Sequence, residues 1–278
     1  MTFCCEQSLT MIILCRVSGG RFIEALRSGR PAIQAGLSGS PLAADVIAHA
    51  GFDGCWIDLQ HGHLDPRDLS PLTAVVAPHG VTVTVRVPAN EPSVIARSLD
   101  AGAYAVVCPD VHTAREAEAF AAACRYAPQG IRGFGPSRAS LRAAFAGSAV
   151  STQAENDTVM AIAQIESPEG LENVEAIVGT AGIDGIFPGM VDYALLAEGR
   201  LLPGLSFLDP GVRDPLKRII EVTHAAGKTI GLPAARPEEV PELVALGADW
   251  ILFGGELGWL MGGARSTLSA WQAALDGK

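Results

Sequence analysis

Short apolar runs alternate with amphipathic stretches from Arg21 almost to the end of the chain, and this alternation limits the available folds. Eight runs have the length and composition of buried parallel strands. The predicted strands span residues 32–37, 54–58, 82–87, 103–107, 159–165, 185–187, 229–231 and 250–253. The predicted helices between them span residues 41–49, 65–76, 92–100, 114–124, 169–178, 215–226 and 237–246. Eight strand–helix units predict a single (β/α)8 TIM barrel in the α/β class.

The length of the chain favours one domain. Its 278 residues match one α/β barrel and leave little room for a second domain. We expect residues 1–20 to be a poorly ordered extension and residues 21–278 to form the barrel. A doubly wound open sheet is the alternative fold. It is disfavoured because residues 36–41, after the first strand, lack the G-x-G-x-x-G spacing of a dinucleotide-binding loop.

Charge and cysteine usage restrict the partners and the compartment. The formal net charge is -10 and no Lys/Arg cluster is present, which argues against a nucleic-acid partner. The six cysteines form no CxxC pair, as is usual in a reducing cytoplasm. The apolar run at residues 9–15 is too short to span a membrane and lacks the flanks of a signal peptide. We therefore predict a cytoplasmic protein that binds small molecules.

Two carboxylates follow consecutive strands of the predicted barrel. Glu166 ends the apolar run at residues 159–166, and Asp192 ends a similar segment that begins at Ile183. Strands joined by one crossover helix are usually neighbours, so both acids should lie at the C-terminal edge, where α/β barrels carry their active sites. Two oxygen ligands at this edge suit Mg²⁺ or Mn²⁺. The alternative is that each acid favours the start of the helix that follows it.

Polar side chains also end the second, third and fifth predicted strands. Asp58 and His61 follow the second strand, and the acid could hold the imidazole in one tautomer for proton transfer. Arg86 ends the third strand, where its guanidinium could grip a carboxylate or pair internally with Asp58 or Glu166. Gln164 lies two residues before Glu166. The histidines with weaker or structural assignments are His63, His49, His79, His112 and His224.

Six stretches of the chain carry a family resemblance in their order and spacing. They are GFDGCWIDLQH at residues 51–61, VRVP at 85–88, LDAGA at 99–103, RYAPQGIRG at 125–133, QIE at 164–166 and GIFPGMVD at 185–192. Together they resemble the metal-dependent class II pyruvate aldolases of the HpcH/HpaI type, which cleave 4-hydroxy-2-oxo acids. The resemblance runs from about Arg21 to the last helix and implies a barrel of the phosphoenolpyruvate/pyruvate-binding type.

The resemblance implies a role for each polar residue of the predicted site. Glu166 and Asp192 would bind a divalent cation, with Mg²⁺, Mn²⁺ and Co²⁺ as the candidates. Arg86 would bind the carboxylate and enolate of pyruvate, and His61, partnered by Asp58, would transfer the proton. The residues expected to contact substrate are Arg86, Gln164, Gly189, Met190 and Val191. The resemblance also implies a homo-oligomer, a trimer or hexamer, with barrel-end helices exchanged between subunits.

The chain departs from the family pattern near the substrate. Gln60 stands where Glu is common, and Met190 and Ala194 occupy a segment that commonly reads Gly-Pro-Ala-Asp-Leu-Ser. The proposed ligands are all retained, but the changes reshape the predicted substrate mouth. The identity of the aldehyde is therefore left open.

The predicted chemistry is aldol cleavage to pyruvate and an aldehyde. A bound cation would accept the charge that develops on the keto oxygen, giving a metal-bound pyruvate enolate, and Arg86 would add a fixed positive charge. The predicted strands carry no lysine for a Schiff base. An oxaloacetate decarboxylase or an acyl-CoA lyase could use the same groups, and a non-catalytic barrel that binds a small acid is a further alternative.

One insertion breaks the regular period of the chain. Residues 125–157 separate the fourth helix from the fifth strand, and the start of this segment is rich in Gly, Pro and Arg. Insertions of this length are often functional. We expect this one on the catalytic side of the barrel, where Arg125, Arg132 and Arg138 would bind an anion or contact another subunit.

Overall fold

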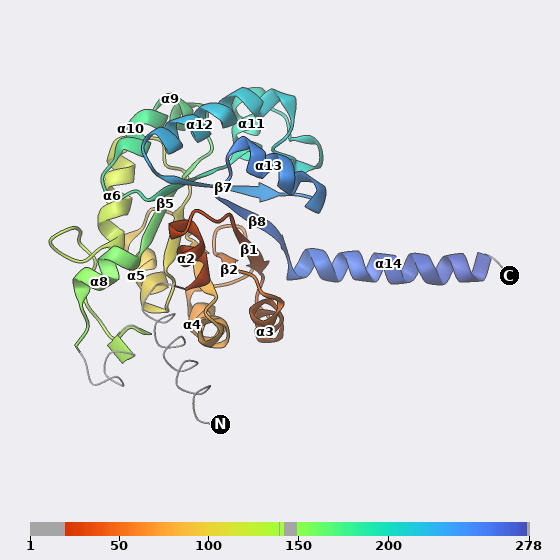
Figure 1. The fold of residues 1–278 in the computed structure, drawn as a ribbon, viewed down its shortest axis with the longest axis horizontal. Helices are drawn as coiled ribbons and strands as arrows, with labels where there is room; N and C mark the ends of the chain where they lie inside the picture. The colour runs from red at the N-terminus through yellow and green to blue at the C-terminus, as the bar shows by residue number, and fades with distance from the viewer. Residues whose placement is uncertain (1–19, 139, 142–148, 277–278) are drawn as a thin grey trace.

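The strands form a closed parallel barrel in a computed structural model that describes residues 20–138, 140–141 and 149–276. They pair in sequence order, and β8 closes the barrel against β1 (Figure 1). The strands are β1 (Ala32–Leu37), β2 (Gly54–Asp58), β3 (Thr82–Arg86), β4 (Ala105–Cys108), β5 (Met160–Ile165), β6 (Gly185–Pro188), β7 (Thr229–Ala234) and β8 (Trp250–Gly255). The predicted TIM barrel is confirmed. Except for Gly20, the predicted N-terminal extension lies outside the described residues.

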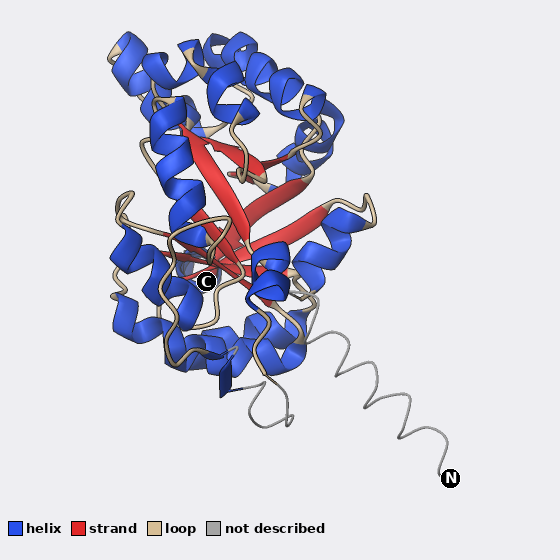
Figure 2. Ribbon diagram, turned by 90° about the vertical axis from the view of Figure 1, so that its left-hand side faces the viewer, coloured by secondary structure: helices blue, strands red, loops and turns tan. Residues whose placement is uncertain are grey.

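Helices surround the strands (Figure 2). The α-helices are α2 (Arg21–Arg27), α3 (Pro41–Ala50), α4 (Leu69–Val76), α5 (Pro92–Asp100), α6 (Ala114–Cys124), α8 (Thr152–Thr158), α9 (Pro168–Glu172), α10 (Val174–Gly179), α11 (Met190–Glu198), α12 (Arg213–Ala225), α13 (Val240–Leu246) and α14 (Glu256–Asp276). Short 3₁₀ turns are η1 (Pro66–Asp68), η2 (Ala77–His79), η3 (Pro203–Leu205), η4 (Pro210–Val212) and η5 (Pro237–Glu239). The predicted helix at 169–178 is divided at Asn173.

Side chains alternate between the inside and the outside of the barrel along each strand. Outward residues such as Val83 and Val85 of β3 are buried in the core cluster that includes the surrounding helices. Inward residues belong to a separate cluster that contains Trp56, Phe187 and Trp250. The rings of Phe187 and Trp250 stack with centroids 5.4 Å apart. Large aromatic side chains therefore fill the barrel interior, so the barrel is not an open pore.

The N-terminal end of the barrel is closed by α2, and three aspartates at this end pair with basic side chains. Phe22 of α2 is fully buried, and its ring meets Trp250 edge-on. An aspartate precedes each of β2, β6 and β8 and accepts a hydrogen bond from a backbone N–H of the neighbouring strand. Each also has a basic partner, in the pairs Asp53–Arg30, Asp184–Arg125 and Asp249–His224. The hydrogen bonds of all three acids, and the charges of Asp53 and Asp184, are thus used within the fold.

The arginine-rich insertion also lies at this end, so its predicted position on the catalytic side is wrong. The physical reason is connectivity, because a helix that follows a barrel strand returns the chain to the N-terminal end, and the insertion follows α6. Arg125 is buried and pairs with Asp184, directly before β6. Arg132 is buried and pairs with Asp100 at the end of α5. The side chain of Arg138 approaches the turn that precedes β4.

The last helix, α14, runs away from the barrel (Figure 1). Every residue from Leu257 to Asp276 is exposed. Its exposed large apolar side chains are Leu257, Trp259, Leu260, Met261, Leu268, Trp271 and Leu275. Within the described residues, neither this helix nor any other has the length and apolar character needed to cross a membrane.

Candidate active site

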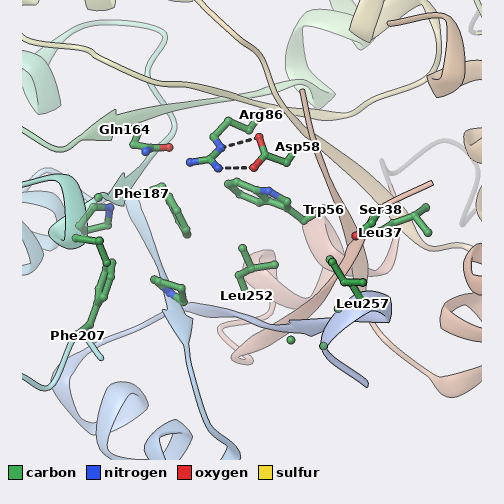
Figure 3. Close-up of a pocket in the computed structure, with 18 of the residues that line it drawn as sticks. Leu37, Ser38, Trp56, Asp58, Arg86, Gln164, Phe187, Phe207, Leu252 and Leu257 are labelled. Atoms are coloured by element: carbon green, nitrogen blue, oxygen red, sulfur yellow. Dashed lines mark hydrogen bonds and ion pairs between the residues drawn. The ribbon is translucent and has the colours of Figure 1, made fainter. Parts of the chain in front are cut away.

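A cavity of about 380 Å³ opens at the C-terminal ends of the strands (Figure 3). The inward positions of β2 and β3 continue to Asp58 and Arg86 at their last residues, and Gln164 holds the corresponding place on β5. Trp56 and Phe187, from the inner aromatic cluster, line the cavity beneath them. Further lining side chains are Leu37, Ser38, Val191, Asp192, Phe207, Leu252 and Leu257. Because side chains alternate along each strand, the last inward positions place these polar groups at the mouth of the cavity, above the aromatic side chains.

Arg86 and Asp58 form a two-point ion pair at adjacent strand ends, where β2 and β3 place them in register. The Nε of Arg86 donates to Asp58 Oδ1 at 3.0 Å, and its Nη2 donates to Oδ2. The guanidinium also lies 5.8 Å from the centroid of the Trp56 ring. Burial works against ionisation of Asp58, but the hydrogen bonds and charge of Arg86 outweigh it, so the pKa of Asp58 is lowered. This internal pairing was one of the two alternatives left open by the sequence.

The predicted pairing of Asp58 with the His61 side chain is wrong. The carboxylate of Asp58 is engaged by Arg86, and it accepts hydrogen bonds from the backbone N–H groups of Gln60 and His61. The imidazole of His61 is exposed, and it is not among the described residues that line the cavity. Asp58 therefore anchors the loop after β2 and orients Arg86.

Glu166 is the most strongly perturbed carboxylate of the site. It is 4% exposed, and burial raises its pKa to about 7. Opposing hydrogen bonds come from the backbone N–H of Asp110 at 2.8 Å and from the side-chain amide of Gln164. Gly189 permits this packing, since an added Cβ at that residue would lie 2.4 Å from the Cβ of Glu166. Ser167 caps α9, so Glu166 is not the cap of the following helix.

Two further carboxylates lie close enough to Glu166 to raise its pKa by repulsion. Asp192 lies in the first turn of α11, just past β6, and lines the cavity. Asp110 follows β4 with a positive φ of 54°. Among the described residues lining the cavity, Arg86 alone is cationic, and Asp58 already engages it. Three neighbouring acids without a cationic partner in the described structure form a donor set that fits a hard divalent cation.

Of the other residues predicted to contact substrate, some line the cavity and one does not. Gly189 and Val191 line it, as expected for substrate-binding positions. Met190 does not, because its side chain is fully buried in the outer core, so the expectation that it shapes the substrate mouth is wrong. Gln164 lines the cavity, and its buried Oε1 has no hydrogen-bond partner in the described structure. Sequence reasoning missed Asp110 and the cavity-lining Trp56, although Trp56 shares the inward phase of Asp58.

These features define a class of protein: a TIM barrel whose C-terminal mouth combines a clamped arginine with a cluster of three acids, of which Glu166 is buried, suited to a small carboxylic acid and a cation. The family model for HpcH/HpaI aldolase/citrate lyase matches residues 37–201. The chain belongs to this family. Members named as aldolases are carbon–carbon lyases, and the relatives place this chain among the class II pyruvate aldolases.

Three similar proteins illustrate the relationship. A hydroxypyruvate/pyruvate aldolase from Rhizorhabdus wittichii is 35% identical over 242 residues, which cover 87% of this chain and 94% of the relative. A 5-keto-4-deoxy-D-glucarate aldolase from Shigella dysenteriae is 36% identical over 220 residues, covering 79% and 83%. The crystal structure of an HpcH/HpaI aldolase/citrate lyase family protein from Burkholderia cenocepacia superposes with a TM-score of 0.80 at 30% identity, covering 90% and 98%.

Proposed function

We propose that this protein catalyses the divalent-metal-dependent cleavage of a 4-hydroxy-2-oxo acid to pyruvate and an aldehyde, and the reverse condensation. The observation that carries the proposal is the acidic cluster of Glu166, Asp110 and Asp192 beside an arginine already neutralised by Asp58. A buried anionic carboxylate is costly without positive charge nearby. A bound cation would supply that charge at the place where a 2-oxo acid would meet Arg86.

Glu166 and Asp192 are the proposed metal ligands. Their oxygens suit Mg²⁺, Mn²⁺ or Co²⁺, and such a cation supplies a Lewis acid that withdraws electrons from the keto oxygen of the substrate. Glu166 must lose its proton before it can act as a ligand. The hydrogen bonds from Asp110 and Gln164 hold its oxygens in place and favour the ionised form.

Arg86 is proposed to bind the carboxylate of the 2-oxo acid and to face the negative charge that develops during cleavage. Two of its nitrogens are held by Asp58, while Nη1 has no partner in the described structure and points toward the Gln164 side of the cavity (Figure 3). The clamp fixes the guanidinium before substrate arrives, which lowers the cost of reorganisation. Asp58 is therefore a positioning residue. The unpartnered Oε1 of Gln164 is available to a substrate hydroxyl or to water.

His61 remains the proposed group that takes the proton from the C4 hydroxyl. It belongs to the loop whose backbone Asp58 anchors at the catalytic edge, and imidazole is suited to proton transfer near neutral pH. The exposed imidazole must approach through the loop or act through water, since it does not line the cavity. His63, two residues further along the loop, is the alternative base.

The cavity favours an aldehyde without a second carboxylate. Its wall away from Arg86 carries Phe207, Leu252 and Leu257, and no cationic side chain other than Arg86 lines it among the described residues. A buried carboxylate left without a partner would cost several kcal/mol, roughly 3–5 for an unpaired buried charge. We therefore expect preference for neutral aldehydes over one that bears an acid, such as a glucarate-derived fragment.

Two alternative reactions and one non-catalytic role use the same groups. Oxaloacetate decarboxylation yields the same pyruvate enolate without any alcohol to deprotonate, and we expect it as a slow side reaction. An acyl-CoA lyase would need basic residues for phosphates, yet Arg125 and Arg132 are paired internally at the other end of the barrel. A pure binder of small acids would show metal-dependent affinity but no turnover.

We also propose a homo-oligomer in which α14 packs on a second copy of the chain. An isolated exposed helix is marginal in water, and α14 presents Trp259, Leu268 and Trp271 to solvent. Leu42 and Val46 are also exposed; they belong to α3, the helix that follows β1, and α14 follows β8, which pairs with β1. A partner's helix would cover both sets of apolar side chains. Size-exclusion chromatography with light scattering tests this, and a monomer at micromolar concentration would contradict it.

The decisive experiment is pyruvate release from a panel of 4-hydroxy-2-oxo acids with and without a terminal second carboxylate. Each is assayed with metal-stripped protein and after addition of Mg²⁺, Mn²⁺ or Co²⁺. The proposal predicts turnover only with a cation, and faster turnover of the monocarboxylates. Equal turnover after chelation would contradict the metal assignment. If no 4-hydroxy-2-oxo acid is turned over but pyruvate binds in a metal-dependent way, the pure binder is favoured.

The compartment of the protein is proposed to be reducing, in keeping with the free buried Cys55, Cys108 and Cys124.

A further inference from the structure

Two imidazoles and one carboxylate converge on the outside of the barrel, at the opposite end from the cavity. Asp45 and His49 lie one turn apart near the C-terminal end of α3, and His79 ends the turn η2 that follows α4. One potential ligand atom from each residue lies within 4.8 Å of the other two. The two imidazole rings have centroids 4.5 Å apart and are tilted by 57°.

We propose that Asp45, His49 and His79 bind a transition-metal cation of the Zn²⁺, Ni²⁺ or Cu²⁺ class, at a site separate from the catalytic cavity. Two nitrogen donors and one carboxylate oxygen form the donor set that these borderline metals prefer, whereas Mg²⁺ and Ca²⁺ prefer oxygen alone. Three protein ligands leave a fourth tetrahedral position for water or an exogenous ligand. The two sites of the chain thus differ in chemistry as well as in place.

The local structure provides two of the three ligands on a rigid frame. An i, i+4 pair lies on one face of a helix, and Nδ1 of His49 already lies 3.4 Å from Oδ1 of Asp45. The same Nδ1 lies 2.9 Å from the Asp45 backbone carbonyl. Metal–ligand distances of about 2.0–2.2 Å require the three donors to draw closer together than 4.8 Å. The side chains of His49 and Asp45 are 64% and 52% exposed, so they are free to rotate toward a cation.

The third ligand comes from a different element, and this gives the site a structural consequence. α3 follows β1 and packs against α4, while His79 lies in the turn that leads into β3 (Figure 1). A cation held by Asp45, His49 and His79 would fasten α3 to η2. Because the unfolded chain does not bring these residues together, binding would stabilise the folded state in proportion to cation concentration.

The test is equilibrium dialysis of the full chain against Zn²⁺ in a large excess of Mg²⁺, which competes for oxygen-only sites. Wild type is expected to retain about one more Zn²⁺ per chain than His79→Gln or His49→Gln. The matched control is His63→Gln, which removes another exposed imidazole from the loop after β2 and should leave the Zn²⁺ count unchanged. Glu166→Gln should also keep this Zn²⁺, which separates the site from the proposed catalytic metal.

Thermal unfolding provides a second measurement on the same proteins. In the same excess of Mg²⁺, Zn²⁺ should raise the Tm of wild type and of His63→Gln but not that of His79→Gln, and Tm values without Zn²⁺ should agree because both substituted side chains are exposed. Equal Zn²⁺ retention by wild type and His79→Gln would overturn the proposal. A loss of the same size in His63→Gln would also overturn it, since it would show general binding to surface histidines.

Discussion

The two ends of the barrel treat carboxylates in opposite ways. At the N-terminal end, Asp53, Asp184 and Asp249 each accept a backbone N–H and meet a basic side chain. At the C-terminal end, Glu166 and Asp192 repel one another, and burial raises the pKa of Glu166 to about 7. Acids whose charge is matched tie strands together. Acids without a cationic partner leave negative charge that a bound cation can neutralise. The N-terminal end of the barrel thus serves the fold, and the C-terminal end is suited to reaction.

The two ends of the barrel also differ in backbone conformation. Asp110 is the non-glycine residue with a positive φ among those described, and its N–H donates to Oε1 of Glu166. The left-handed region costs a non-glycine residue roughly 1–2 kcal/mol. The strained turn therefore lies at the unmatched end, where it positions a hydrogen bond to the proposed metal ligand.

The largest expected effect contrasts one acid from each end. Glu166→Gln removes a proposed metal ligand, so we expect kcat/KM to fall by roughly 10³-fold, more than for a group that merely orients a ligand. Asp184→Asn leaves buried Arg125 without its full partner and should lower the free energy of unfolding by roughly 1–3 kcal/mol with kcat retained. Pyruvate release and urea unfolding measure both. Catalysis lost through Asp184→Asn and kept in Glu166→Gln would break the contrast between the ends.

The next effect concerns the ion pair that lines the cavity, Arg86–Asp58. Arg86→Lys keeps the charge but loses the planar two-point contact with Asp58, so kcat/KM should fall roughly 10²-fold. Asp58→Asn frees Arg86 without removing it and should have a smaller effect, about tenfold. Steady-state kinetics of both variants provide the measurement. A greater loss in Asp58→Asn than in Arg86→Lys would show that Asp58 takes part in the reaction directly.

Strand positions could be predicted because burial imposes a repeating pattern on them. The predicted bounds of β1 and β2 match the structure, and other strands differ by a few residues at their ends. The pattern also fixes which residues face inward, and hence that Asp58, Arg86 and Gln164 reach one edge. It carries less information on loops, where no periodicity acts. The position of the Arg125–Arg138 segment was nevertheless implied by connectivity, because a segment between a helix and a strand lies at the N-terminal end.

The sequence indicated which residues belong to the site more reliably than which of them pair with one another. Asp58 could serve either Arg86 or His61, and only the register of β2 against β3 shows that Arg86 lies beside it. Met190 begins a helix, and the helical period turns Met190 and Ala194 into the core while Val191 and Asp192 face the cavity. The unmatched charge of the acidic cluster depends on three strand ends at once, so no local sequence pattern reveals it.

A more selective effect is expected for the loop after β2. His61→Ala should lower aldol cleavage by roughly 10²-fold, because a C4 hydroxyl must be deprotonated, but it should leave oxaloacetate decarboxylation nearly unchanged. Pyruvate formation from both substrates by the metal-loaded variant, less the rate of free cation, gives the two values. Equal losses for both reactions would show that His61 acts on the enolate or on the fold. Unchanged cleavage would transfer the role to His63 or to water.

The smallest expected effect is a pH-dependent stability of the metal-free protein, caused by Glu166. Burial raises the pKa of Glu166 to about 7, so between its ordinary value and pH 7 the folded state binds more protons than the unfolded state. Stability should therefore be greatest below the ordinary pKa and should fall as pH rises to about 7, by roughly 1–3 kcal/mol. Urea unfolding in the presence of chelator, from pH 5 to 8, measures the change.

Glu166→Gln supplies the control, because a neutral amide of similar size removes this titration and should flatten that part of the profile. A saturating divalent cation should cancel the loss above pH 7 in wild type, because binding requires the ionised carboxylate. If wild type and Glu166→Gln show the same slope, the charge of Glu166 is already compensated in the metal-free protein, and the contrast between the two ends of the barrel fails.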